Sequence, residues 1–377
     1  MNHLVQIVVG GLLQGSVFAV VALGQSLVYR ATGIINLSQG AFCVLAALLY
    51  ERLSEGLGWP AIVACLAAAA VTTLAGTALG AATFVPGLSR LADSSMLMLT
   101  AGLLVLLEGL MLVAWGSQPY AVAPFSGEPP ITVLGIRVPS QGPWIGGVSL
   151  LVFITVWYFV NRTDSGRALL ACGENPYAAR LLGVDVQRMA LVTFGVAALI
   201  AALGGITLAP VVALDFSTGR FFTTAGFIAV AIGGMNSLAG AIGGGLFLGV
   251  AEQLAAGYVS SLFSNALALG LLLLVLLWRP DGLFPSRSSR RRDVRDDPRV
   301  PRTVVRLRGP RALLTAAGTV AVLAVLAALF VFPRRSPAAT ARYAEEPVES
   351  TSGRRSRTLR SSRARSRERS CMRWRSR

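Results

Sequence analysis

Residues 162–188, RTDSGRALLACGENPYAARLLGVDVQR, are the only long polar stretch that carries arginine within the first 284 residues of the chain. The sequence on both sides is apolar over lengths close to the roughly 20 residues that a helix needs to cross a hydrocarbon core of about 30 Å. Hydrophobic residues make up 54% of the chain, and its mean hydropathy of +0.64 is high for a soluble domain. We therefore expect a polytopic membrane protein in which this stretch is a connecting loop.

Arginines in the short loops predict the orientation, because cytoplasmic loops carry an excess of positive charge. Arg30, Arg90, the 162–188 loop and Arg279 fall on one side, which we take as cytoplasmic, and the N-terminus then lies outside. The expected crossings lie at about 5–29, 33–50, 60–85, 94–116, 142–161, 189–213, 221–256 and 261–278.

The block at 221–256 has to cross twice or form a re-entrant loop, since 189–213 leads out and 261–278 leads back in, so that both of its flanks lie on the external side. Its centre, GGMNSLAGAIGGG (233–245), offers a natural turn near Asn236. Non-helical backbone at membrane depth needs protein or a water-filled cavity around its polar groups. The predicted fold class is an all-α polytopic transmembrane bundle of about 8–10 spans with broken or re-entrant segments.

The segments outside this bundle differ in composition from it. The external segment 117–141 has a Val/Ile-rich stretch at 131–138 and is expected to hold a small hairpin or cap. Residues 1–284 carry 10 Arg against 11 acids. Residues 285–377 carry 24 Arg against 7 acids, so the net charge of +16 belongs to this tail. We predict a basic linker at 285–311, a further apolar run long enough to span at 312–332, and a disordered Arg/Ser-rich tail at 333–377. A nucleic-acid or anionic-lipid arm is the other interpretation of such a tail, but we expect no nucleic-acid partner.

Several kinds of chemistry are excluded by composition. The chain has no Lys, which a phosphate-binding P-loop requires, so it is not a Walker-type ATPase by itself. A single His and four cysteines without CxxC spacing give no metal site, no disulfide framework and no His-based catalysis. We expect no enzyme activity, no cofactor and no metal in this chain.

Two polar, glycine-flanked stretches within apolar segments are candidates for a translocation path. The first is GIINLSQGAF (33–42), with Asn36, Ser38, Gln39 and Gly40; the second contains Gly234, Asn236 and Ser237. Transporters aim the backbone dipoles of broken helices at a substrate, and polar side chains at this depth are costly unless they face protein or water. Interhelical hydrogen bonding and turn capping are the alternative interpretations.

Three acids lie within or beside apolar runs. Glu108 lies in the middle of its segment without an obvious Arg partner, so we expect it to be protonated or to face a cavity on the path. Glu252 is a weaker candidate, and Asp93 is expected to cap the helix that follows it.

The 162–188 loop predicts a short helix. Asn175 is its expected cap, Pro176 its first residue and Gly183 its left-handed end. A short amphipathic helix in a cytoplasmic loop can fit a groove on a partner protein, and a plain connecting loop is the alternative. The candidate coupling residues are Glu174, Asn175, Ala178, Ala179, Arg180, Leu182 and Gly183.

Taken together, the chain resembles the permease subunits of branched-chain amino acid ABC importers, the LivH-like group. The resemblance rests on GLLQGSVFAVVALGQSLVYRATGIINLSQGAF, ACGENPYAARLLGVDVQRMALVTF followed by AALGGI, GFIAVAIGGMNSLAGAIGGGLFLGVAE and LLLLVLLWRPDGLFP. These motifs bracket residues 8–285, about three quarters of the chain, in the expected order.

The resemblance implies a multi-pass permease of the bacterial cytoplasmic membrane that moves branched-chain or related amino acids. It also implies a second homologous permease, two cytoplasmic ATPase subunits that bind ATP, an external substrate-binding protein and contact with membrane lipid. Glu174–Gly183 would dock on the ATPase, and Asn36–Gly40 and Gly233–Gly240 would lie by the path. Gln39 departs from the His found at this place in many relatives. Residues 302–332 look like the start of a second, truncated permease.

Three alternatives stay open on the sequence alone. A urea or short-amide ABC permease would share the same motifs. A channel or secondary transporter that needs no ATPase would be favoured by paired intramembrane charges, and the sequence suggests no basic partner for Glu108 or Glu252. An integral membrane enzyme is disfavoured because no nucleophile–base pair or metal-ligand cluster is present.

Overall fold

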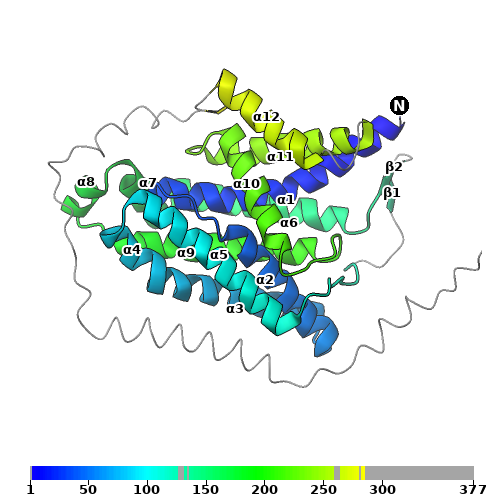
Figure 1. Ribbon diagram of the computed structural model, residues 1–377, viewed down its shortest axis with the longest axis horizontal. Helices are drawn as coiled ribbons and strands as arrows, with labels where there is room; N and C mark the ends of the chain where they lie inside the picture. The colour runs from blue at the N-terminus through cyan, green and yellow to red at the C-terminus, as the bar shows by residue number, and fades with distance from the viewer. Residues whose placement is uncertain (1, 126–130, 134–135, 259–263, 280–281, 285–377) are drawn as a thin grey trace, which may run out of the picture. The chain divides into compact units, whose positions relative to one another are not determined.

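The computed structural model describes residues 2–125, 131–133, 136–258, 264–279 and 282–284. The predicted linker, the additional span and the tail, 285–377, lie outside these residues. The described part is a helical bundle, so the predicted fold class is confirmed (Figure 1). Six of its helices are long and apolar enough to cross a membrane, and α10 and α12 are shorter apolar helices.

The described helices run in this order: α1 (Asn2–Thr32), α2 (Gln39–Glu51) with a π-helical turn η1 (Arg52–Gly56), α3 (Ala61–Leu79), a second π-helical turn η2 (Gly80–Phe84), α4 (Val85–Arg90), α5 (Asp93–Trp115), α6 (Gly142–Arg162), α7 (Asp164–Glu174), α8 (Pro176–Leu181), α9 (Val186–Leu208), α10 (Thr218–Gly233), α11 (Leu238–Tyr258) and α12 (Ser264–Trp278). The expected block at 221–256 is divided into α10 and α11 by a turn at 234–237, as predicted. Helix α5 begins at Asp93 and its N-cap residue is Ala92, so the N-cap position lies one residue before the predicted one.

The external segment contains the predicted hairpin. Strands β1 (Ile131–Val133) and β2 (Ile136–Val138) pair in antiparallel fashion, with Thr132 opposite Arg137. Figure 1 shows this hairpin at the end of the bundle opposite to α7 and α8. The 162–188 loop and the hairpin therefore lie at opposite ends, as the predicted orientation requires.

Helix α1 is the centre of the bundle. It packs against α11, α9, α10 and α6, and its stretch Val17–Val28 is almost entirely buried. Glycines allow the closest of these contacts: a Cβ on Gly249 of α11 would overlap the backbone of Gly15 in α1. Small residues at such crossings let helix backbones approach one another, which is how helices associate where lipid supplies no hydrophobic drive.

The outer helices present apolar side chains to their surroundings. Ile62 of α3, Met98 of α5 and Trp157 of α6 are 76%, 76% and 56% exposed. Such a surface would aggregate in water but is what a helix facing lipid requires. The periphery of the bundle therefore suits contact with lipid, and the buried polar contacts lie inside.

Candidate functional site

The break between α1 and α2 brings the predicted path residues together. Thr32 ends α1, and residues 33–38 are non-helical until α2 begins at Gln39. Asn36 closes this break, because its Oδ1 accepts hydrogen bonds from the Ser38 amide (3.1 Å) and the Ser38 hydroxyl (2.6 Å). Asn36, Ser38 and Gln39 are all fully buried. The Ser38 amide of the break is thus satisfied by protein, which is what a broken helix at membrane depth needs.

Gln39 joins three helices at this break. Its Nε2 donates to the carbonyl oxygen of Ala197 in α9 at 2.8 Å. The same amide lies directly on Gly24 of α1, where no side chain separates the two. A buried amide in apolar surroundings has to find partners, so Gln39 positions α2 against both α1 and α9.

Helix α10 meets the break on its other side. Thr223 Oγ1 accepts a hydrogen bond from the Gly40 amide (3.1 Å) and donates to the Leu37 carbonyl (3.0 Å). Gln25 of α1 donates to the Thr223 carbonyl at 3.1 Å, while its own Oε1 is buried without a protein hydrogen bond. The sequence of α10 did not predict that Thr223 bonds to the break, because the hydroxyl of a threonine in a helix usually donates to a carbonyl in the preceding turn of the same helix.

The second predicted stretch forms the turn between α10 and α11. Gly234 adopts φ +107°, and Ser237 Oγ accepts a hydrogen bond from the Gly240 amide at 3.0 Å. Ser26 of α1 donates to the Met235 carbonyl at 3.2 Å. Ser237 therefore caps the start of α11, and this turn, with Asn236 in it, is tied to the central helix. A role of Gly234, Asn236 or Ser237 in the path stays a prediction.

Glu108 has a basic partner, and the expectation that it lacks one is wrong. Arg220, in the first turn of α10, donates from Nε to both carboxylate oxygens of Glu108 in α5 at 3.0 Å. The Glu108 side chain is 5% exposed and that of Arg220 is 64% exposed. The sequence could not show this pair because 112 residues separate its members and only the fold brings the start of α10 beside α5.

Glu252 is hydrogen-bonded to the side-chain amide of Gln14 and not to a basic residue. Gln14 of α1 donates to its carboxylate at 3.0 Å, and Gln253 donates to Gln14 at 2.6 Å. Within the part of the chain that the structure describes, Glu252 forms no ion pair. This chain of amides was not predicted, although Gln14, Glu252 and Gln253 all stand out as polar residues in apolar helices.

The predicted short helix in the 162–188 loop is present as α8. Asn175 Oδ1 accepts hydrogen bonds from the amides of Tyr177 and Ala178, both at 3.0 Å. Gly183 ends the helix at φ +82°, where a residue with a side chain would be strained. The predicted caps are therefore confirmed.

Helix α8 has one buried face and one exposed apolar face. Ala179 is buried and Ala178 half-buried, whereas Glu174, Arg180, Leu182 and Gly183 are exposed. Tyr177, Leu181 and Leu182 are 52%, 73% and 82% exposed. We call these three residues the α8 patch. Tyr177 and Leu181 were missed as candidates, although their i, i+4 spacing places both on the same face of a helix.

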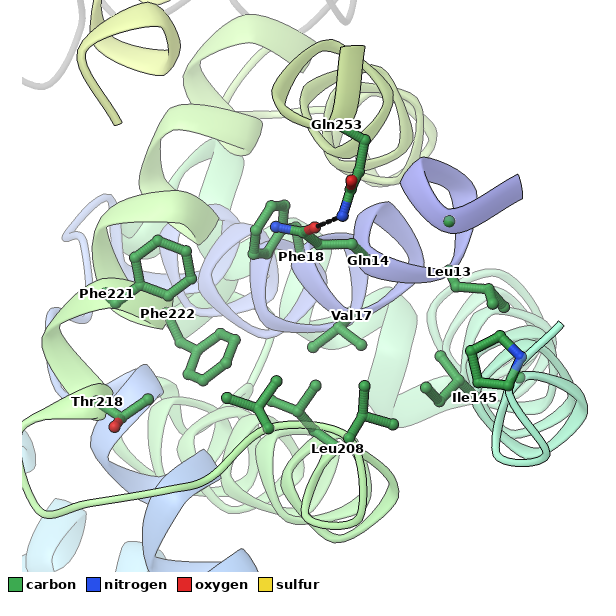
Figure 2. Close-up of a pocket in the computed structure, with 15 residues that line it drawn as sticks. Leu13, Gln14, Val17, Phe18, Ile145, Leu208, Thr218, Phe221, Phe222 and Gln253 are labelled. Atoms are coloured by element: carbon green, nitrogen blue, oxygen red, sulfur yellow. Dashed lines mark hydrogen bonds between the residues drawn. The ribbon is translucent and has the colours of Figure 1, made fainter. Parts of the chain in front are cut away.

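An apolar cavity of about 350 Å³ opens beside the outer half of α1 (Figure 2). Its wall contains Val17, Ile145, Leu208 and Phe222, with Gln14 and Gln253 on one edge. None of the predicted path residues lines it. No described group of three or more His, Cys, Asp or Glu residues could hold a metal ion.

The family model for "Branched-chain amino acid transport system / permease component" matches residues 7–277. The chain belongs to this family. LivH, the high-affinity branched-chain amino acid transport system permease protein of Escherichia coli K12, is 28% identical over 303 residues, which cover 75% of this chain and 96% of LivH. BraD, with the same description in Pseudomonas aeruginosa, is 29% identical over 300 residues, with the same coverage.

The chain is also similar to a permease that is described with another substrate. RbsC of Escherichia coli K12, a ribose import permease protein, is 30% identical over 236 residues, which cover 62% of this chain and 70% of RbsC. As a permease of this family with six apolar helices, the chain is a multi-pass protein of the cytoplasmic membrane, as predicted. It is the permease component of an ABC-type transporter.

Proposed function

We propose that this chain is the translocation subunit of an ATP-driven importer for branched-chain or related amino acids. In this proposal it pairs with a second homologous permease, two cytoplasmic ATPase subunits that bind and hydrolyse ATP, and an external substrate-binding protein. The chain itself needs no cofactor. The observation that carries the proposal is the α8 patch, because three large apolar side chains exposed on a polar loop form the kind of surface that a partner protein covers.

The packing of the loop supports a route for force from the ATPase to the membrane helices. Helix α7 joins α8 to the bundle and contacts the end of α1, where Gly173 lies against the carbonyl of Arg30. Helix α1 in turn packs along α11, α9 and α10. Movement of α8 on ATP binding would then be passed through α7 to the central helix, and would open the path alternately to the two sides.

The family relatives and the buried contacts support this proposal over a channel or secondary transporter. The sequence argued against a channel or secondary transporter because it suggested no paired charges within the membrane. That argument no longer holds, since Glu108 pairs with Arg220. However, Arg220 neutralises Glu108 through a bidentate contact, which is strong and geometrically specific. The similarity to RbsC leaves the substrate class to be tested.

Uptake of labelled amino acids into proteoliposomes tests this proposal. The chain would be co-expressed with a second permease and an ATPase from its own organism, and purified binding protein would be added outside. We expect leucine uptake that requires both ATP and binding protein. Uptake at the same rate without ATP, or uptake by this chain alone, would contradict the proposal.

A further inference from the structure

Helix α10 exposes a short polar strip at its predicted external end. The Arg220 side chain is 64% exposed, Phe221 beside it is 37% exposed, and Thr224 is exposed one turn further on. The Thr224 hydroxyl donates to the Arg220 carbonyl at 2.9 Å, so these two residues share one face of the helix. We call Arg220, Phe221 and Thr224 the α10 strip. From Ala225 to Gly233 the helix is buried, apart from the half-buried Phe227.

The strip lies at membrane depth. Its depth follows from the ion pair, because Arg220 contacts Glu108 at 3.0 Å and Glu108 belongs to the candidate span Ser94–Trp115. At about 1.5 Å per residue, Glu108 lies about 10 Å inside the predicted external end of that span. A long basic side chain near the end of a span can extend to the membrane surface, but the contacts with Glu108 hold this guanidinium in place.

An exposed guanidinium at this depth does not suit a lipid-facing surface. Charged side chains within spans almost always face the interior of a bundle or a water-filled cavity, because hydrocarbon cannot solvate them. Nε and Nη2 of Arg220 contact Glu108, which leaves the other edge of the guanidinium, with Nη1, directed away from the carboxylate. The exposed side chains Ile62, Met98 and Trp157 of the outer helices are apolar by contrast. The strip therefore needs surroundings other than lipid.

We propose that the α10 strip lines a water-filled path, in which Arg220 attracts anionic groups such as carboxylates. Phe221 also lines the apolar cavity beside α1 (Figure 2), so the path adjoins this cavity. The inference rests on the proposed function and deepens it, because it adds Arg220 and Thr224 to the residues of the translocation path. It does not depend on the identity of the substrate, since it uses only the cost of an exposed charge in hydrocarbon.

Cysteine labelling tests whether water reaches the strip. Thr224→Cys places the reporter in the strip. Leu106→Cys is the control, because Leu106 is 50% exposed and lies two residues before Glu108, on the other side of α5. Measured from the ion pair, Leu106 is about 3 Å deeper in the membrane and Thr224 about 6 Å deeper, so depth alone does not favour the strip.

Two membrane-impermeant methanethiosulfonates, one with a sulfonate and one with a trimethylammonium group, would be added to cells that express the chain with a second permease and an ATPase from its own organism. Labelling of the wild-type chain, which has four cysteines, is the background. We expect Thr224→Cys to react at least about tenfold faster than Leu106→Cys, because the reactive thiolate forms in water and not in hydrocarbon. Phe221→Cys is the second reporter if Thr224→Cys does not accumulate.

Arg220→Gln, combined with Thr224→Cys, tests the effect of the charge. This change should lower the ratio of the sulfonate rate to the ammonium rate by at least about threefold, because it removes a positive charge one helical turn from the reporter. Arg167→Gln removes the same charge at α7, at the other end of the bundle, and should leave the ratio unchanged.

Three outcomes decide the inference. Strip cysteines that react no faster than Leu106→Cys would overturn it and show that lipid or the second permease covers the strip. A ratio that Arg220→Gln leaves unchanged would overturn the role of Arg220 in attracting anions. Labelling is read without transport, so labelling as expected in a complex without ATP-dependent uptake would contradict the proposed importer and leave the water-filled strip in place.

Discussion

Arg220 of α10 holds the buried carboxylate of Glu108 in α5 through three nitrogen–oxygen contacts of 3.0 Å. The pair fixes the first turn of α10 to α5, and the rest of α10 contacts the break before α2. A largely exposed guanidinium thus neutralises an acid that would otherwise be buried alone.

A double-mutant cycle should show that the two residues act as a pair. Arg220→Ala should destabilise the protein by about 1–3 kcal/mol, because it leaves the Glu108 carboxylate buried and unpaired. Glu108→Gln should cost less, and the double variant should be more stable than Arg220→Ala alone. Thermal unfolding in detergent measures all three. Additive effects of the two single changes would show that the pair does not interact.

Gln39 should stabilise the junction of α1, α2 and α9 through its bond to the Ala197 carbonyl. Gln39→Leu keeps the approximate size of the side chain but removes the donor, and should cost about 1 kcal/mol. Gln6→Leu, at an exposed position of α1, is the control and should have little effect on the unfolding midpoint. Equal midpoints for the two variants would mean that the Gln39 bond contributes nothing to stability.

The crossing of α1 and α11 should not tolerate a side chain. Gly249→Ala would place a Cβ against the backbone of Gly15 and should destabilise the protein by about 1–3 kcal/mol or more. Gly102→Ala in α5 is the control, because no atom lies within 4 Å of a Cβ built there. That change should be neutral or stabilising by up to about 1 kcal/mol, since alanine favours helix more than glycine does. Size-exclusion profiles and unfolding midpoints distinguish the two variants.

The Asn175 cap should matter for α8 and for transport, not for the bundle. Asn175→Ala removes the acceptor for the Tyr177 and Ala178 amides and should cost about 1 kcal/mol locally, while Asn175→Asp should retain the cap. Hydrogen exchange at these two amides should accelerate in the alanine variant only, with lower uptake and an unchanged unfolding midpoint. A global loss of stability would show that α8 is part of the core.

Local signals were sufficient to predict the long apolar helices and α8, but not α7 (Asp164–Glu174) or the non-helical residues 33–38 before α2. Apolar length gave the spans, and the Asn175–Pro176 and Gly183 signals are properties of neighbouring residues, so both ends of α8 follow from sequence. The turn near Asn236 followed from the parity of crossings.

The partners of the polar residues could not be predicted in the same way. Glu108 finds Arg220, Gln39 finds Ala197 and Gln14 finds Glu252 across 112, 158 and 238 residues. Such contacts depend on which helices are neighbours, and hydropathy carries no information on that order. The exposed face of α8 could be predicted only in part. Helical spacing places Tyr177 and Leu181 on the same face, but only the burial of Ala179 shows which face of the helix points outward.

Co-purification from membranes tests most directly whether an ATPase docks on α8. Leu181→Asp puts a charge into the α8 patch, whereas Arg167→Ala changes the net charge by the same amount on α7, outside the patch. We predict that wild type and Arg167→Ala each bring down a second permease and an ATPase, identified by mass spectrometry, and that Leu181→Asp loses the ATPase while keeping the permease. Wild-type protein that is stable, homomeric and free of any ATPase would contradict the account.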